Sequence, residues 1–169
     1  MNSSSIANIK KDRLRYSKNT LSSSLTILSI VFNALYFIII YKSDVGSFYY
    51  TYLIGISIVY NLLFMLISFL ASEGVKNYNI NYSYALIVLG IGQIIRIFIL
   101  PTSAHSSVIT LSSESQQVMS DGQFFTVCVF LIGSAAFSIM AGITAFVKTK
   151  TLRSYEAEIE EITRGETNE

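Results

Sequence analysis

Residues 21–41 read LSSSLTILSIVFNALYFIIIY, an uncharged stretch long enough to cross a bilayer as a helix. The hydrocarbon core of a membrane is about 30 Å thick, and a helix of about 20 residues spans it. Comparable stretches follow at residues 48–71, 82–100 and 123–147, and the only charge in any of them is Arg96. Strands are excluded because the runs do not alternate and because lipid cannot hydrogen-bond an open strand edge. The sequence therefore predicts an all-α integral membrane four-helix bundle.

The composition also indicates a membrane protein. Of 169 residues, 51% are hydrophobic and 14% are charged, which is too apolar for an ordinary soluble domain. The net charge of +1 gives no indication of a nucleic-acid partner. One Cys and one His cannot by themselves form a closed metal site, so we expect neither a metal nor a cofactor. Abundant Ile, Asn and Lys without Trp suggest a bacterial protein, and hence a multi-pass protein of the bacterial cytoplasmic membrane.

The distribution of Lys and Arg predicts that both termini are cytoplasmic. Basic residues are concentrated in the N-terminal segment, 1–20, and in the C-terminal tail, 148–169, whereas the long connection 101–122 contains none. Positive residues are retained on the cytoplasmic side, so we expect an N-in, C-in bundle at 21–147 with a long extracytoplasmic loop between its third and fourth helices. Within that loop, the capping-box spacing of Ser113 predicts a short surface helix through Val118.

Tyrosines and one proline mark the expected ends of the spans. Without Trp, Tyr has to supply the aromatic belt at the membrane surfaces. We expect Tyr41, Tyr49, Tyr50 and Tyr52 at the outer surface and Tyr78, Tyr82 and Tyr84 at the inner one. Pro101 is predicted to end the third span, because proline interrupts a helix.

Polar side chains in the spans recur every three or four residues and so share single helical faces. They are Ser22, Thr26, Ser29, Asn33 and Tyr36 in the first span and Ser57, Asn61, Ser68 and Ser72 in the second, where the apolar Phe64 fills the remaining position of the stripe. In the fourth span the same spacing gives a small-residue ridge of Ser134, Ser138 and Gly142. Such residues face protein rather than lipid. We interpret these stripes as packing surfaces of a compact bundle, and the alternative is a path for a polar solute.

Two nine-residue stretches resemble each other, SIVFNALYF at 29–37 and SIVYNLLFM at 57–65. They lie in spans that run in opposite directions. We interpret the similarity as chance in Ile-rich membrane sequence, and the alternative is an inverted duplication.

The third span carries the two strongest polar groups, Gln93 and Arg96. Helical rise places Gln93 at the depth of Asn33, which predicts a hydrogen bond between spans one and three. Arg96 lies about 6 Å from the predicted outer end of its span, so we expect it to reach water or headgroups. The alternatives are a ligand anchor, or an ion pair with a partner protein or with one of Asp44, Glu114 and Asp121.

The tail, 148–169, is predicted to extend the last span as a short cytoplasmic helix. Its apolar residues Leu152, Tyr155, Ile159 and Ile162 follow helical spacing between glutamates. This stripe is either a solvated helix end or a contact surface for a partner subunit.

The spans contain no Asp or Glu, the residues that ion-coupled transporters usually need within the membrane. His105 lacks the recognisable acid and oxyanion donors of a hydrolase. We therefore expect no enzyme. We favour a non-catalytic accessory or assembly subunit of a bacterial membrane complex, in contact with lipid and with other subunits or copies of itself. The alternative is a self-associating pore, holin-like protein or small-solute facilitator.

Overall fold

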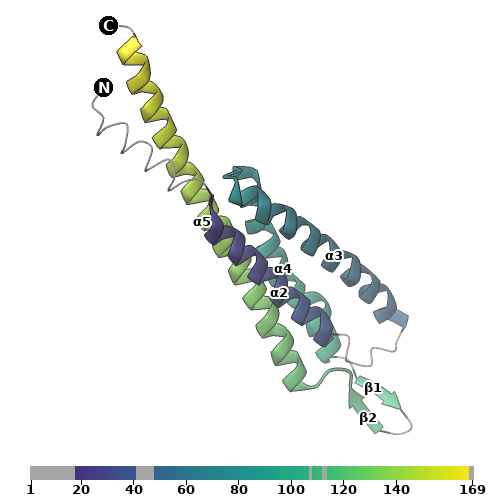
Figure 1. Cartoon of the computed structure of the whole chain (residues 1–169). Helices are drawn as coiled ribbons and strands as arrows, with labels where there is room; N and C mark the ends of the chain where they lie inside the picture. Colours follow the sequence, from purple (N-terminus) through teal and green to yellow (C-terminus); the bar gives the residue numbers. More distant parts are fainter. Residues whose placement is uncertain (1–17, 41–47, 107, 112–113, 168–169) are drawn as a thin grey trace.

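The computed structural model describes residues 18–40, 48–106, 108–111 and 114–167. Its elements, in chain order, are the helices α2 (Thr20–Ile40), α3 (Phe48–Lys76) and α4 (Ile80–Ser106), the strands β1 (Val108–Leu111) and β2 (Glu114–Gln117), and the helix α5 (Asp121–Thr167). Figure 1 shows a bundle with the strands at one end, here called the hairpin end, and a projecting part of α5 at the other, the tail end.

Four helices of the described chain are long and apolar enough to cross a membrane. They correspond to the four predicted spans, so the prediction of a helical membrane bundle is confirmed at this level. The helices are longer than the predicted spans at several ends: α3 continues to Lys76, α4 begins at Ile80 and ends at Ser106, and α5 runs unbroken from Asp121 to Thr167.

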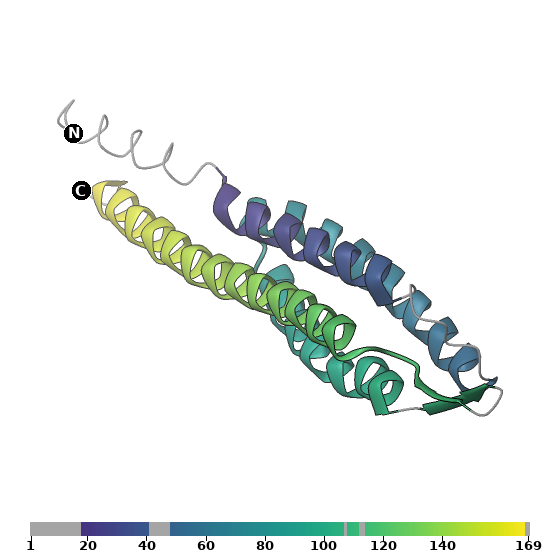
Figure 2. The ribbon, with the colours of Figure 1, turned by 90° about the horizontal axis from the view of Figure 1, so that it is seen from below.

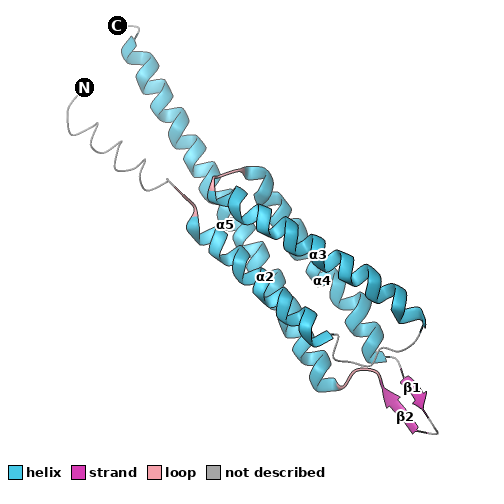
Figure 3. Ribbon diagram, turned by 45° about the vertical axis from the view of Figure 1, so that its right-hand side comes forward, coloured by secondary structure: helices cyan, strands magenta, loops and turns pink. Residues whose placement is uncertain are grey.

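Each helix packs against the next one along the chain, and α5 closes the bundle against α2. Figure 2 shows α2 beside α3 and α4 beside α5, and Figure 3 shows that the long axes of the four helices are roughly aligned. The α4–α5 pair packs most extensively, whereas α3 barely touches α5. Consequently α3 is held mainly by α2 and α4.

The prediction that α4 ends at Pro101 is wrong, because this proline lies inside the helix. Proline lacks the N–H that would donate to the carbonyl of Ile97 one turn earlier. The hydroxyl of Thr102 donates to that carbonyl instead, at 2.9 Å. A neighbouring side chain thus replaces the missing backbone hydrogen bond, as is common in membrane helices.

The predicted short helix before Val118 is also wrong. The described residues of this connection form an antiparallel pair, β1 and β2, in which Val108 is opposite Gln117 and Leu111 is opposite Glu114. The β-branched run from Val108 favours an extended conformation. Ser113, on which the capping box depended, lies outside the described residues.

The interior has two apolar clusters with polar side chains between them. At the hairpin end, buried residues of α2, α4 and α5 form one cluster with Val118 and Met119, which follow the strands. At the tail end, a smaller cluster joins α3, α4 and α5. The polar stripes predicted for the first and second spans are buried throughout, and the middle layer that they help to form contains the candidate site.

At the tail end, Asn19 joins three helices. Its Oδ1 accepts from the backbone N–H of Ser22 at 3.4 Å, which caps α2. Its own N–H donates to the carbonyl of Lys76 at the end of α3, at 3.0 Å. The Nζ of Lys148 in α5 donates to the same Asn19 Oδ1, at 3.3 Å. These contacts fix where α2 begins relative to its neighbours.

The predicted aromatic belt is described only in part. Tyr52 and Tyr84 are exposed on the bundle surface. Tyr82 instead packs over Gly74 of α3, where an added Cβ would collide with the ring, and Tyr78 has a φ of 57° in the α3–α4 turn. Tyr41 and most of the basic N-terminal segment lie outside the described residues, as do the side chains of Tyr49 and Tyr50.

Replacing Thr102 by valine should destabilise the bundle, because the carbonyl of Ile97 then loses the hydroxyl that replaces the proline N–H. We expect a loss of about 1 kcal/mol in the free energy of unfolding, measured by SDS titration in mixed micelles. Thr102→Ser keeps the hydroxyl and should behave like the unmodified chain. Equal losses in both variants would contradict the proposed role of the hydroxyl.

Candidate functional site

The small-residue ridge of α5 lies against α2 and α4. Ser29 and Ser134 donate to each other's backbone carbonyls, at 2.7 and 3.0 Å, which joins α2 to α5. Ser138 donates to the carbonyl of Leu86 at 2.8 Å, which joins α5 to α4. All three serines are fully buried. The hydroxyls therefore connect helices.

Gly142, the third residue of the ridge, allows a close approach between α4 and α5. A Cβ at this position would lie 2.8 Å from the carbonyl oxygen of Ser83 and 3.2 Å from the backbone nitrogen of Ile87. Backbone atoms cannot move aside as a flexible side chain can. A glycine is thus required by the distance between the two helices.

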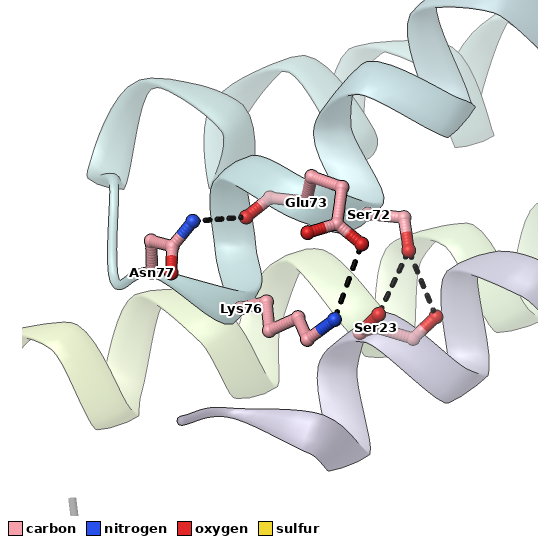
Figure 4. Close-up of polar contacts among 5 residues, drawn as sticks. All are labelled: Ser23, Ser72, Glu73, Lys76 and Asn77. Carbon is pink, nitrogen blue, oxygen red and sulfur yellow. Dashed lines mark hydrogen bonds and ion pairs between the residues drawn. The ribbon is translucent and has the colours of Figure 1, made fainter. Parts of the chain in front are cut away.

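A second serine pair joins α2 to α3 near the tail end (Figure 4). The hydroxyls of Ser23 and Ser72 are 2.8 Å apart, and Ser72 also contacts the carbonyl of Ser23 at 3.4 Å. On the exposed side of α3, Lys76 and Glu73 form an ion pair of 3.2 Å. The serine pair holds the tail end of α3 against α2. The other end of α3, toward the hairpin, is held by a different contact.

Arg96 provides that contact, and the expectation that it reaches water or headgroups is wrong. Its side chain is only 5% exposed. The physical reason is helix direction: side chains tilt toward the N-terminus of their own helix, and the N-terminus of α4 is at the tail end. Moreover, α4 continues to Ser106, which leaves Arg96 about 15 Å from the hairpin end of its helix.

Neutral oxygens on two other helices hold the guanidinium. Nη1 donates to Oδ1 of Asn33 in α2 at 3.2 Å and to Oδ1 of Asn61 in α3 at 2.9 Å. Nη2 donates to the hydroxyl of Ser57 in α3 at 2.9 Å and contacts its carbonyl at 3.4 Å. One side chain of α4 therefore bonds to both α2 and α3.

Two tyrosine rings and one amide complete the group, called here the Arg96 cluster: Asn33, Tyr36, Ser57, Tyr60, Asn61, Gln93 and Arg96. The guanidinium carbon lies 4.3 Å from the centre of the Tyr36 ring and 5.0 Å from that of Tyr60, within the range of cation–π attraction. The predicted bond between Gln93 and Asn33 is present, from Nε2 to Oδ1 at 2.9 Å.

The two similar stretches of α2 and α3 meet in this cluster. Each supplies an asparagine that accepts from Nη1 of Arg96, and each supplies a tyrosine whose ring lies against the guanidinium. The asparagines occupy equivalent positions in SIVFNALYF and SIVYNLLFM. The similarity between the two stretches could therefore have indicated that both contact the same residue. It could not identify that residue as Arg96.

Polar atoms of the cluster without a hydrogen-bond partner among the described residues include Nδ2 of Asn33, Oε1 of Gln93 and the hydroxyl of Tyr60. The Tyr60 hydroxyl lies over Gly92 of α4, where a Cβ would be only 2.7 Å away. Buried polar atoms of this kind are commonly satisfied by water or by a ligand.

A cavity of about 200 Å³ between α3 and α4 reaches the cluster. Its walls are almost entirely apolar, and its lining residues are Ile56, Ser57 and Tyr60 of α3 with Gly92, Ile95, Arg96, Ile99 and Leu100 of α4. A second hollow of about 550 Å³ follows α3 and shares Ile56 and Tyr60 with the first. The Arg96 cluster is thus adjacent to space that opens on the lipid-facing side of the bundle.

The carboxylates considered as partners of Arg96 are placed elsewhere or not described. Asp121 is exposed and lies 3.8 Å from Nε2 of His105, whose ring stacks on Phe124. The side chains of Asp44 and Glu114 lie outside the described residues. Within the described part of the chain, no group of three His, Cys, Asp or Glu side chains is arranged to hold a metal.

The apolar tail stripe is separate from this cluster. Leu152, Tyr155 and Ile159 are half-buried on the part of α5 that continues past the bundle, and the side chain of Ile162 is not described. The intervening glutamates are exposed.

Chemically, the Arg96 cluster is a fixed cation in a low-dielectric setting. An arginine stays protonated at any physiological pH, so it does not transfer protons. It can hold a neighbouring helix in place or attract an anion. Comparison with protein families, curated proteins and solved structures finds no match for this chain.

A double-mutant cycle between Asn61 and Arg96 tests the cluster. Asn61→Leu should cost about 2 kcal/mol of unfolding free energy, because a buried charged donor loses an acceptor. In an Arg96→Leu background the same change should cost much less, giving a coupling energy of about 1 kcal/mol or more. Asn77, whose side chain bonds to the carbonyl of Glu73, is the control and should show no coupling. Additive losses for Asn61 and Arg96 would contradict the contact.

Gly142→Ala should destabilise the bundle by about 1–2 kcal/mol in the same assay, since the new methyl group meets backbone atoms of α4. Gly55→Ala is the matched control, because nothing lies within 4 Å of a Cβ at that position. It should be neutral or stabilise by up to about 1 kcal/mol through helix propensity. The α4–α5 contact would need revision if Gly142→Ala behaved like Gly55→Ala.

Proposed function

We propose that this chain is a non-catalytic integral protein of the bacterial cytoplasmic membrane that serves as an accessory or assembly subunit. In this proposal both termini are cytoplasmic and the β-hairpin is outside. The bundle anchors the protein, and the projecting part of α5 contacts a partner subunit.

The length of α5 is the observation that carries the proposal. The helix has 47 residues, which corresponds to about 70 Å, whereas the hydrocarbon core is about 30 Å thick. Residues 150–167 therefore form an extension of about 27 Å at the tail end (Figure 1). A continuous helix of this length places side chains well beyond the membrane surface in a defined direction.

The extension has a chemical character that suits a protein partner. Glu156, Glu158, Glu160 and Glu161 are all exposed. Mixed acidic and apolar surface on a helix is suited to a complementary basic surface. The interior supports the non-catalytic part of this proposal, since its buried serines and amides form hydrogen bonds between helices.

The tail contact can be tested by charge reversal. We expect the chain, extracted in mild detergent, to carry a second polypeptide in fixed ratio in native mass spectrometry. Glu158→Lys together with Glu161→Lys should release it, because the acidic face is inverted while the helix is kept. Glu73→Lys reverses an exposed charge on the bundle and should retain it.

Two results would contradict the tail contact. One is retention of the partner by the double reversal and by a chain truncated after Thr151. The other is a homo-oligomer without a second polypeptide that conducts solute in liposomes. That second result would favour the alternative of a self-associating pore or facilitator.

The proposed orientation predicts which cysteines react from outside. In a Cys128→Ser background, Ser106→Cys at the hairpin end should react with a membrane-impermeant maleimide in intact cells. Glu158→Cys in the tail should react only after permeabilisation. Both native residues are exposed in the structure, so both cysteines should react in detergent. The reverse pattern would overturn the N-in, C-in orientation.

A further inference from the structure

The extension of α5 continues the helical side that is buried inside the bundle. Residues buried against the other helices recur on α5 at alternating steps of four and three: Ser134, Ser138, Ala141 and Ala145. The same steps continue through Lys148 to the apolar tail residues Leu152, Tyr155, Ile159 and Ile162. Residues at these steps share one side of a helix. The side that α2 and α4 cover within the bundle therefore runs on into the extension, which projects past them (Figure 1).

The charges of the extension are arranged unevenly around this stripe. A helix turns about 100° per residue, so Glu156 and Glu158 lie about 80° to either side of the centre of the stripe. Both are exposed. Lys150, Arg153 and Arg164 lie about 140–160° from the centre, on the opposite side of the helix. The stripe thus has a negative charge along each edge. We call this surface the tail face, and its residues are Leu152, Tyr155, Glu156, Glu158 and Ile159.

The N-terminal segment of the same chain leads into the structure at the base of the tail face. Residues 1–17 lie outside the described residues. The segment ends next to Asn19, whose Oδ1 accepts from Nζ of Lys148 at 3.3 Å, and Lys148 is the stripe residue just before the tail face. Two segments tethered this closely meet at an effective concentration of the order of millimolar.

The segment is long enough to reach along the tail face. Even at the helical rise of 1.5 Å per residue, 17 residues extend about 25 Å, whereas Ile159 lies about 17 Å from Lys148. The length of the segment is therefore sufficient in any backbone conformation from helical to extended.

The chemistry of the segment complements that of the tail face. Residues 1–18 contain five basic residues and one acidic residue, a net charge of +4, whereas residues 150–167 contain three basic and five acidic residues, a net charge of −2. Opposite charges on facing surfaces favour association. The segment also contains apolar side chains that can cover the stripe, at Ile6, Ile9, Leu14 and Tyr16.

We infer that the basic N-terminal segment of this chain binds the tail face, with its Lys and Arg side chains at Glu156 and Glu158 and its apolar side chains on the stripe. The inference goes beyond the proposed subunit role and holds with or without a second polypeptide. A partner that binds the tail face has to displace the segment, so the contact is autoinhibitory. Anionic lipid headgroups are the competing site for a basic segment, and the test includes them.

Zero-length crosslinking tests the contact in phosphatidylcholine nanodiscs that hold one chain each. A carbodiimide joins an amine to a carboxylate only when the two are in contact. Lys76 and Glu73, whose charged groups are 3.2 Å apart, provide an internal positive control. One chain per nanodisc ensures that every crosslink found by mass spectrometry is intramolecular.

Lys10 and Lys11 should be joined to Glu156 or Glu158 at least about fivefold more often than to Glu161, which lies about 140° from the centre of the stripe. A charge swap supplies a further check: Lys10→Glu and Lys11→Glu, combined with Glu156→Lys and Glu158→Lys, should give crosslinks between the same positions with the charges exchanged.

Trypsin provides an independent readout, because it cleaves after the basic residues of the segment. Glu156→Gln with Glu158→Gln should raise the rate of cleavage after Arg13 and Arg15 about fivefold, since two surface ion pairs are lost. Both substitutions keep a good helix former in α5.

The matched control is Glu160→Gln with Glu161→Gln. It removes the same number of carboxylates from positions about 120° and 140° from the centre of the stripe. The rate of cleavage after Arg13 and Arg15 should stay unchanged in this variant.

Three results would overturn the inference. The first is equal crosslinking of Lys10 and Lys11 to Glu158 and Glu161, and the second is equal cleavage of the two glutamine variants. The third is loss of the crosslinks when phosphatidylglycerol is added, which would assign the segment to lipid headgroups. Native mass spectrometry tests the subunit role separately: a second polypeptide bound to a chain without these crosslinks would support that role and reject this inference.

Discussion

Hydrocarbon offers no hydrogen-bond partner, and this constraint determines how the helices of the bundle are joined. Ser29 with Ser134 joins α2 to α5, Ser23 with Ser72 joins α2 to α3, and Arg96 joins α4 to both α2 and α3. Such bonds average only about 0.6 kcal/mol each in a membrane protein. Their larger effect is on geometry, since a rotated helix would leave its polar groups facing lipid.

The position of α3 depends most on the Arg96 cluster. This helix barely touches α5, so its main polar attachments are the bond from Asn19 to Lys76 and the serine pair near the tail end, and the guanidinium farther along. The cavity lies beside the guanidinium, between α3 and α4. The residue that holds the two helices together therefore also lines the space between them, and an occupant of that space would contact the element that organises the bundle.

The spans and their inward faces were predictable because membrane thickness and helical period act locally. The stripe from Ser22 to Tyr36 is buried as its spacing implies. The interior position of Arg96 was not predictable from depth alone, because it depends on helix direction and on the asparagines of two other helices. Pro101 stays helical because Thr102 supplies a hydrogen bond, and the strands at Val108–Leu111 depend on pairing with Glu114–Gln117.

The inward orientation of Arg96 is the central claim, and solid-state NMR in bilayers tests it most directly. With the guanidinium of Arg96 labelled with 15N and the side-chain carbonyls of asparagine with 13C, dipolar recoupling should show close contacts that Asn33→Leu and Asn61→Leu each weaken. The guanidinium should show no close contact to lipid 31P. Strong 15N–31P recoupling without asparagine contacts would place Arg96 at the headgroups and contradict the account.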